Sequence, residues 1–153
     1  MDITKARVLS IKYGLGINSE QNFSSEWGGF LRASWDDGKT ETWNFTEIDQ
    51  SLSFGLSLKG TSWRRPTDNL AFALLINGLS QDHRDYLSAG GIGFLIGDGK
   101  LNYAPEEIAE IYYLFNITKA LDMTGDFQYV QHPAFNSDRG PVSICSLRLH
   151  YEI

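Results

Sequence analysis

The hydrophobic pattern along the chain has a period of two residues. Near the end of the sequence, Leu147 and Leu149 alternate with Arg148 and His150, and the run closes on the apolar Ile153. Because successive side chains of a strand point to opposite faces, this alternation predicts a β-strand with one apolar face and one polar face.

Six further stretches repeat the alternation, so about seven strands are expected. The cleanest is the run around 51–59, where Leu52, Phe54, Leu56 and Leu58 alternate with serines, a glycine and Lys59. Aromatic and β-branched residues favour strands over the competing helical period around 105–114. The seven expected strands cover 8–20, 28–37, 48–60, 69–79, 107–118, 121–131 and 142–153.

The links between these strands alternate between short and long. In an antiparallel up-and-down meander, the short links at 22–26, 60–69 and 116–120 would all lie at one end of the strands. Outer-membrane barrels have this arrangement, with tight turns on one side and larger loops on the other. The expected sheet is open, with unpaired edges at 7–18 and 142–153, and such edges are prone to association.

Alternation alone does not separate a membrane barrel from a soluble barrel that turns its apolar face inward. Two features favour the membrane barrel. The strands are about 9 to 13 residues long, which suits a tilted membrane crossing better than the five or six residues of most soluble strands. Aromatic residues also gather near strand ends, as they do at membrane interfaces. These aromatic residues are Trp27, Trp35, Tyr113, Tyr129 and Tyr151.

Composition narrows the choice of partners. The chain has 153 residues, a length of about one domain, and a formal net charge of −6, which disfavours nucleic acid and anionic lipid headgroups. It contains one cysteine, Cys145, so no internal disulfide is expected. There is no apolar run long enough for a transmembrane helix, and the first residues lack the apolar core of a signal peptide.

Five motifs resemble the carbohydrate-selective outer-membrane porins of the OprB type. In order along the chain they are "RPTD", "HRDYL", "GDGKL", "PEEIAEIYY" and "DFQYVQHPAFNSDRGPV". The resemblance implies a passive channel for sugars in the bacterial outer membrane. It also implies an all-β transmembrane barrel of about sixteen strands, in which residues 1–153 form a partial domain, the C-terminal half. The implied partners are sugars, outer-membrane lipid and the N-terminal half of the barrel, and a homo-oligomer is left open.

Little in the sequence points to catalysis. No Ser–His–acid set falls on one face at one strand end, so the chain is expected not to be an enzyme and to use no cofactor. The glycine-rich run 90–99 lacks the Lys-Ser/Thr of a phosphate loop and is expected to be a flexible extracellular loop. Asp36, Asp37 and Glu41 are interpreted as a solvated acidic loop and not as a calcium site. No metal is expected either, because the histidines lack ligand spacing. The histidines are His83, His132 and His150.

The polar face supplies the candidate functional residues. Because sugars are neutral, a sugar pore needs hydrogen-bonding side chains and aromatic rings, and opposed charges would order the pore water. Within the long link, roughly 80–105, four residues are candidates for a constriction formed by an inward-folding loop: His83, Arg84, Asp85 and Tyr86. The residues expected to line the pore are Lys12, Arg32, Asp49, Lys59, Glu110, Tyr112, Asp126, Gln128, Arg148 and His150. The leading alternative is a soluble β-barrel that binds a small ligand.

Overall fold

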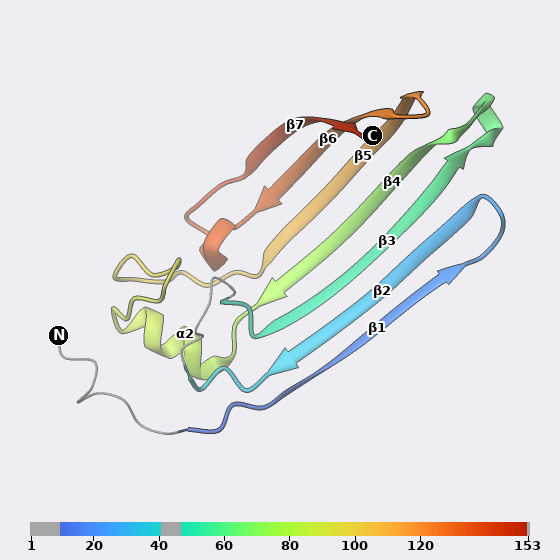
Figure 1. Cartoon of the computed structure of the whole chain (residues 1–153). Helices are drawn as coiled ribbons and strands as arrows, with labels where there is room; N and C mark the ends of the chain where they lie inside the picture. The colour runs from blue at the N-terminus through green and yellow to red at the C-terminus, as the bar shows by residue number, and fades with distance from the viewer. Residues whose placement is uncertain (1–9, 41–46, 153) are drawn as a thin grey trace.

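The computed structural model describes residues 10–40 and 47–152, which form one antiparallel sheet of seven strands in sequential order (Figure 1). The expected meander is therefore confirmed. Arg7, Glu41 and Ile153, which entered the expectations above, lie outside the described residues. The strands are β1 (Gly14–Asn22), β2 (Trp27–Asp36), β3 (Gln50–Gly60), β4 (Arg65–Gly78), β5 (Glu106–Thr118), β6 (Leu121–Gln131) and β7 (Val142–Tyr151).

The short links lie together at one end of the sheet, as expected. They are the turn 23–26, the 3-10 turn η1 (Thr61–Trp63) and the two residues between β5 and β6. The longer links 37–49, 79–105 and 132–141 lie at the opposite end, because every neighbouring pair of strands is antiparallel. The two ends are called here the turn end and the loop end.

Two strand boundaries were predicted wrongly. β4 begins at Arg65, four residues before the expected start, because Gly60 pairs with Arg65 across a register shift that follows Lys59. β1 begins at Gly14 and not near residue 8. Its pairing with β2 stops at Asp36, where the chain turns toward Gly38, whose φ is +57°. Residues 10–13 of the alternating run are therefore not in a strand, although the Asp37 amide still donates to the Tyr13 carbonyl at 3.2 Å.

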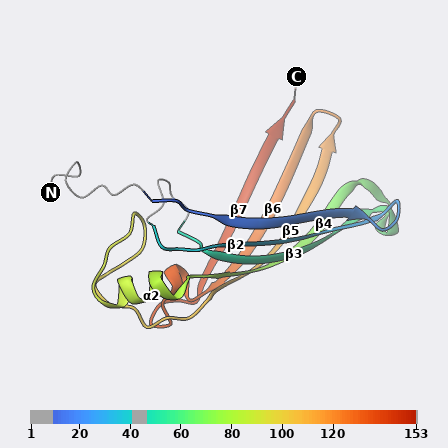
Figure 2. The same cartoon turned by 90° about the horizontal axis from the view of Figure 1, so that it is seen from below.

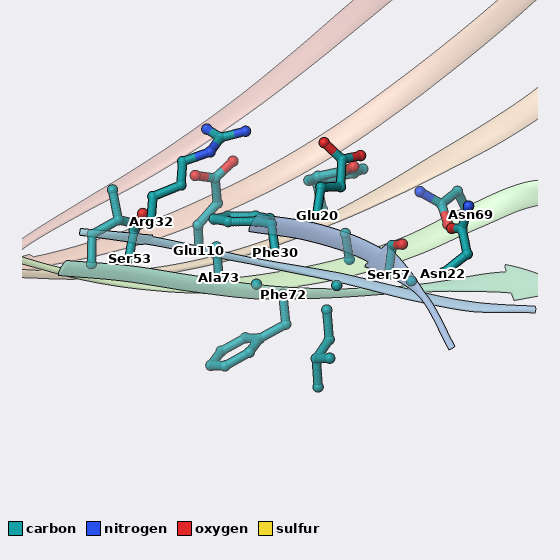
Figure 3. A pocket seen from close by; sticks show the side chains of 17 residues that line it. Glu20, Asn22, Phe30, Arg32, Ser53, Ser57, Asn69, Phe72, Ala73 and Glu110 are labelled. Atoms are coloured by element: carbon teal, nitrogen blue, oxygen red, sulfur yellow. The ribbon is translucent and has the colours of Figure 1, made fainter. Parts of the chain in front are cut away.

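The sheet is a curved trough whose outer strands are β1 and β7 (Figure 2). Within the described residues, neither outer strand has a second neighbour, which confirms an open sheet. The two faces differ in composition, as the alternation predicts. Figure 3 shows Arg32, Glu20 and Glu110 on the concave side, toward which β5 to β7 rise, and Phe72 on the opposite, convex side.

The 79–105 link contains a helix that the sequence analysis did not predict, α2 (Gln81–Ser88). Ser80 caps it, because the Ser80 hydroxyl accepts a hydrogen bond of 3.1 Å from the His83 amide. Both views place α2 beyond the strand ends (Figures 1 and 2). No helix in the described part of the chain is long and apolar enough to cross a membrane.

A small apolar core joins the long links at the loop end. It consists of Leu79, Leu87, Ile96 and Phe135, all of them buried. Phe135 comes from the 3-10 turn η2 (Pro133–Phe135) in the link between β6 and β7. The link 79–105 is therefore packed against the link 132–141 as well as joined to β4 and β5.

Candidate functional site

The concave face carries a hollow that spans β1 to β5 and is lined by both polar and apolar side chains. The hollow has a volume of about 420 Å³. Strand pairing places its polar residues in rows, because directly paired residues share a face. Glu110 pairs with Gln128, and Tyr112 pairs with Asp126, so these four predicted pore residues lie on the same face of neighbouring strands. The residues that line the hollow with hydrogen-bonding side chains are Glu20, Asn22, Arg32, Ser53, Ser57, Asn69, Glu110 and Tyr112.

Arg32 is the cation of this hollow. Its Nε donates a hydrogen bond of 3.1 Å to Asn18 Oδ1, and its guanidinium lies 4.6 Å from the centre of the Phe30 ring. Glu20 and Glu110 line the same hollow from other strands (Figure 3). Opposite charges held on one wall produce a local field across the concave surface, which orients polar molecules next to it.

Three other predicted pore residues also lie on the concave face. Lys59 is exposed and lines a second hollow of about 380 Å³ at the turn end. Arg148 pairs with Thr124, and His150 pairs with Asp122. The Nδ1 atom of His150 is 4.0 Å from a carboxylate oxygen of Asp122.

Two predicted pore residues lie outside the strands. Lys12 precedes β1, and its ammonium is 3.2 Å from an oxygen of Asp36. Asp49 precedes β3 and is 2% exposed, so it does not present its carboxylate from mid-strand as expected. The alternating pattern continues past the true strand ends, which is why both residues were assigned to strands.

Asp49 instead binds the segment that begins α2. Its Oδ2 accepts hydrogen bonds from the Ser80 amide at 2.8 Å and from His83 Nδ1 at 2.9 Å. Burial alone would raise the pKa of Asp49, but the hydrogen bonds from His83 and Ser80, together with the attraction of His83, outweigh burial and hold this pKa below its ordinary value. Gly38 makes this close approach possible, since a Cβ there would lie 2.6 Å from Asp49 Oδ2.

The four residues expected to form a constriction all lie on α2, beyond the strand ends and not over the concave face (Figures 1 and 2). His83 and Tyr86 line a hollow at the loop end. Arg84 is used structurally, because its Nε donates to the Leu79 carbonyl at 2.8 Å and its guanidinium stacks 4.0 Å from the Tyr103 ring centre. Asp85 accepts a hydrogen bond from the side chain of Gln81, one turn earlier.

Glu47, which was not among the residues predicted from the sequence, is 5% exposed in the 37–49 link. Its carboxylate accepts hydrogen bonds from the consecutive amides of Phe94, Leu95 and Ile96, the last two at 2.9 and 2.8 Å. Three successive N–H groups that point at one anion form a backbone anion nest. The run of glycines in 90–99 was the available signal, since a Cβ at Gly93 would collide with Glu47 Oε1 at 1.9 Å.

Asp68, in the motif "RPTD", is the centre of a second cluster, at the turn end. It is 1% exposed and accepts hydrogen bonds from the side chains of Arg65 and Tyr113 and from the Asn116 amide. The Arg65 guanidinium also donates to the Asn116 carbonyl at 2.7 Å. Trp63 donates to the Tyr113 hydroxyl at 2.9 Å. The buried carboxylate with this many donors ties the start of β4 to β5, and the bond from Trp63 adds the turn after β3.

The convex face exposes large apolar side chains along every strand. Leu74, in the central strand β4, is 45% exposed, and Leu147 in β7 is 70% exposed. Strand pairing and alternation place these residues on the face opposite Arg32 and Glu110. The exposed convex set is Leu15, Ile17, Trp27, Leu31, Trp35, Leu52, Phe54, Phe72, Leu74, Ile76, Ile111, Phe127, Leu147, Leu149 and Tyr151.

In the described ranges, there is no group of three or more His, Cys, Asp or Glu side chains placed to hold a metal ion. An open antiparallel meander with apolar residues outside and charged residues inside is the architecture of part of a β-barrel wall. The model of the family described as "Carbohydrate-selective porin, OprB family" matches residues 2–152, and the chain belongs to this family. Comparisons with curated proteins and with solved structures gave no match.

Proposed function

We propose that this chain forms part of the wall of a passive sugar channel in the bacterial outer membrane. The single observation that carries the proposal is the exposed convex face, where large apolar side chains stand outward on all seven strands. Burial of apolar surface stabilises a protein by about 25 cal/mol per Å², so a face of this extent favours lipid over water. Patches this continuous are rare on soluble monomers.

The soluble alternative requires the opposite curvature. A soluble barrel closes around its apolar face and leaves its polar face in water. In this sheet the charged residues Arg32, Glu20 and Glu110 are on the concave side (Figure 3). Closing the sheet along its existing curvature would put these charges inside, where a water-filled pore keeps them hydrated.

The open edges define what completes the wall. Seven strands that alternate in direction leave β1 and β7 parallel to each other. An all-antiparallel barrel contains an even number of strands, so the missing segment must supply an odd number. The family resemblance suggests nine, for a barrel of about sixteen. A second copy of this sheet in the same orientation would bring β7 beside a β1 that runs parallel to it, so two copies would not close an all-antiparallel barrel. A homo-oligomer would therefore form between barrels that are each already closed.

Sugar recognition is assigned to the concave hollow. Arg32 and Glu110 supply a charged donor and acceptor for sugar hydroxyls, and Tyr112 supplies an aromatic ring and a hydroxyl on the same wall. The remaining pore residues assigned here are Lys59, Asp126, Gln128, Arg148 and His150. Lys12 and Asp49 are left out because they lie outside the strands.

The test is cysteine labelling of two neighbouring residues in β3. Leu56→Cys and Ser57→Cys are introduced separately in a Cys145→Ser background, and the full chain is assembled in lipid vesicles. We expect Ser57→Cys to react with a water-soluble thiol reagent and Leu56→Cys to react only with a lipid-soluble one. The reverse pattern would place the polar face outside, and the channel proposal would then be abandoned.

A further inference from the structure

We infer that the hollow at the loop end is a binding site for a single neutral sugar ring, at the mouth of the channel and separate from the concave face. The hollow has a volume of about 260 Å³. Its described walls come from residues 38–40 and 47, from α2 and from the glycine-rich run 90–99, and they include Lys39, Glu47, His83, Tyr86 and Gly93. The inference rests on the proposed function, because it assigns a second sugar site to the same channel.

The walls of the hollow are fixed by two buried carboxylates from the same link. Glu47 holds the 90–99 run through the amides of Leu95 and Ile96, and Asp49 holds α2 through His83 and Ser80. Both carboxylates are almost completely buried. A site whose shape exists before the ligand arrives loses less entropy on binding, which favours affinity for a small ligand.

The groups around the hollow suit a polyhydroxylated ring. Nδ1 of His83 is taken up by Asp49, so Nε2 is the ring nitrogen left to hydrogen-bond a hydroxyl of the ligand. The Lys39 ammonium is a donor, and Asp82, which also lines the hollow, is an acceptor of opposite charge. The lining also contains Glu47, but its carboxylate is taken up by backbone amides, so Lys39 and Asp82 are the charged side chains that remain beside His83. One cation and one anion favour a neutral ligand with both donors and acceptors over a phosphate or a carboxylate.

Tyr86 supplies the aromatic surface for the apolar C–H face of a sugar. Its side chain is exposed, and its hydroxyl donates to the Ile92 carbonyl at 3.2 Å. Gly91 packs on the ring, since a Cβ there would lie 2.5 Å from a ring carbon. The ring is thus held at its hydroxyl and by a glycine beside it. The hollow is smaller than the roughly 300 Å³ at which sites for drug-sized ligands begin, so one ring fits better than two.

The experiment measures binding directly and transport separately. The full chain, labelled at its three histidines, is placed in detergent micelles and titrated with glucose while the histidine ring signals are followed by NMR. We expect the His83 signal to shift as glucose is added. This shift should saturate at a lower glucose concentration than any shift of the His150 signal, which reports on the concave face. Tyr86→Ala and Lys39→Met should each weaken the binding seen at His83 by about five- to tenfold, the equivalent of one hydrogen bond or ring contact.

Two matched variants separate binding from folding. Tyr86→Phe keeps the ring but loses its hydrogen bond to Ile92, so it should bind glucose more tightly than Tyr86→Ala and somewhat less tightly than the parent chain. Ser88→Ala changes α2 outside the hollow and should have no effect. If the His83 signal does not shift, or if Tyr86→Ala and Lys39→Met bind as the parent chain does, the inference is wrong.

Glucose flux into vesicles that hold the barrel completed by its remaining strands distinguishes this failure from failure of the proposed function, because seven strands alone do not enclose a pore. Flux without a His83 shift would support the channel and show that the inferred site at its mouth is wrong. A saturable, Tyr86-dependent shift without flux would keep the mouth site and overturn the channel.

Discussion

The hydrogen bonds that Glu47 accepts from the amides of the 90–99 run give the sharpest quantitative expectation. Glu47→Gln keeps the length of the side chain but replaces one acceptor oxygen with an NH₂ group that faces backbone donors. A hydrogen bond to a charged group contributes about 1.5–3 kcal/mol, and leaving a buried donor unpaired adds a further penalty. We therefore expect the local free energy that holds this run closed to fall by about 2–4 kcal/mol.

Amide hydrogen exchange measures this change at the residues concerned. Because 1.4 kcal/mol is a factor of ten, the amides of Leu95 and Ile96 should exchange roughly 30- to 1000-fold faster in the variant. Amides inside β3 and β4 should exchange as before, because their bonds run between strands. Glu47→Asp retains the charge on a shorter side chain and should give an intermediate rate.

Unchanged exchange at Leu95 and Ile96 in Glu47→Gln would refute the reasoning. The run would then be held by the apolar core, in which Ile96 packs with Leu79, Leu87 and Phe135. A uniform increase across all strands would also contradict it, because it would show that Glu47 stabilises the whole sheet.

Three further expectations follow from other parts of the structure. Leu56→Arg, on the convex face, should destabilise the chain in bilayers by about 2–4 kcal/mol, while Ser57→Arg should leave stability nearly unchanged and alter ion conductance. Since the pKa of Asp49 lies below its ordinary value of 3.8, its stabilisation of the loop end should be complete above that pH and be lost as the pH falls through the lowered pKa. Exchange of the Ser80 amide, corrected for intrinsic rates, should report this loss, and Asp49→Asn should remove the pH dependence. Asp68→Ala should lower the unfolding temperature by more than Tyr113→Phe, because Tyr113→Phe removes only one of the donors to the buried carboxylate; equal effects would contradict a central role for Asp68.

The sequence by itself determined the seven strands, their order and their two faces. The reason is local: a period of two residues assigns each side chain of a strand to a face, and short links force neighbouring strands to run antiparallel. Arg32 and Glu110 could therefore be placed on one face without any coordinates. The five family motifs supplied what periodicity could not, namely which of the two barrel classes the pattern belongs to.

Only the tertiary structure decided what happens at the two strand ends. Asp49 continues the alternating pattern of β3, yet it is buried by Ser80 and His83, which lie 31 and 34 residues further along the chain. Glu47 reaches amides 48 and 49 residues away, at Leu95 and Ile96. The alternating pattern shows to which face of a strand a residue belongs, but not which distant backbone donors will surround it. The positions of those donors depend on how the links fold over the strand ends.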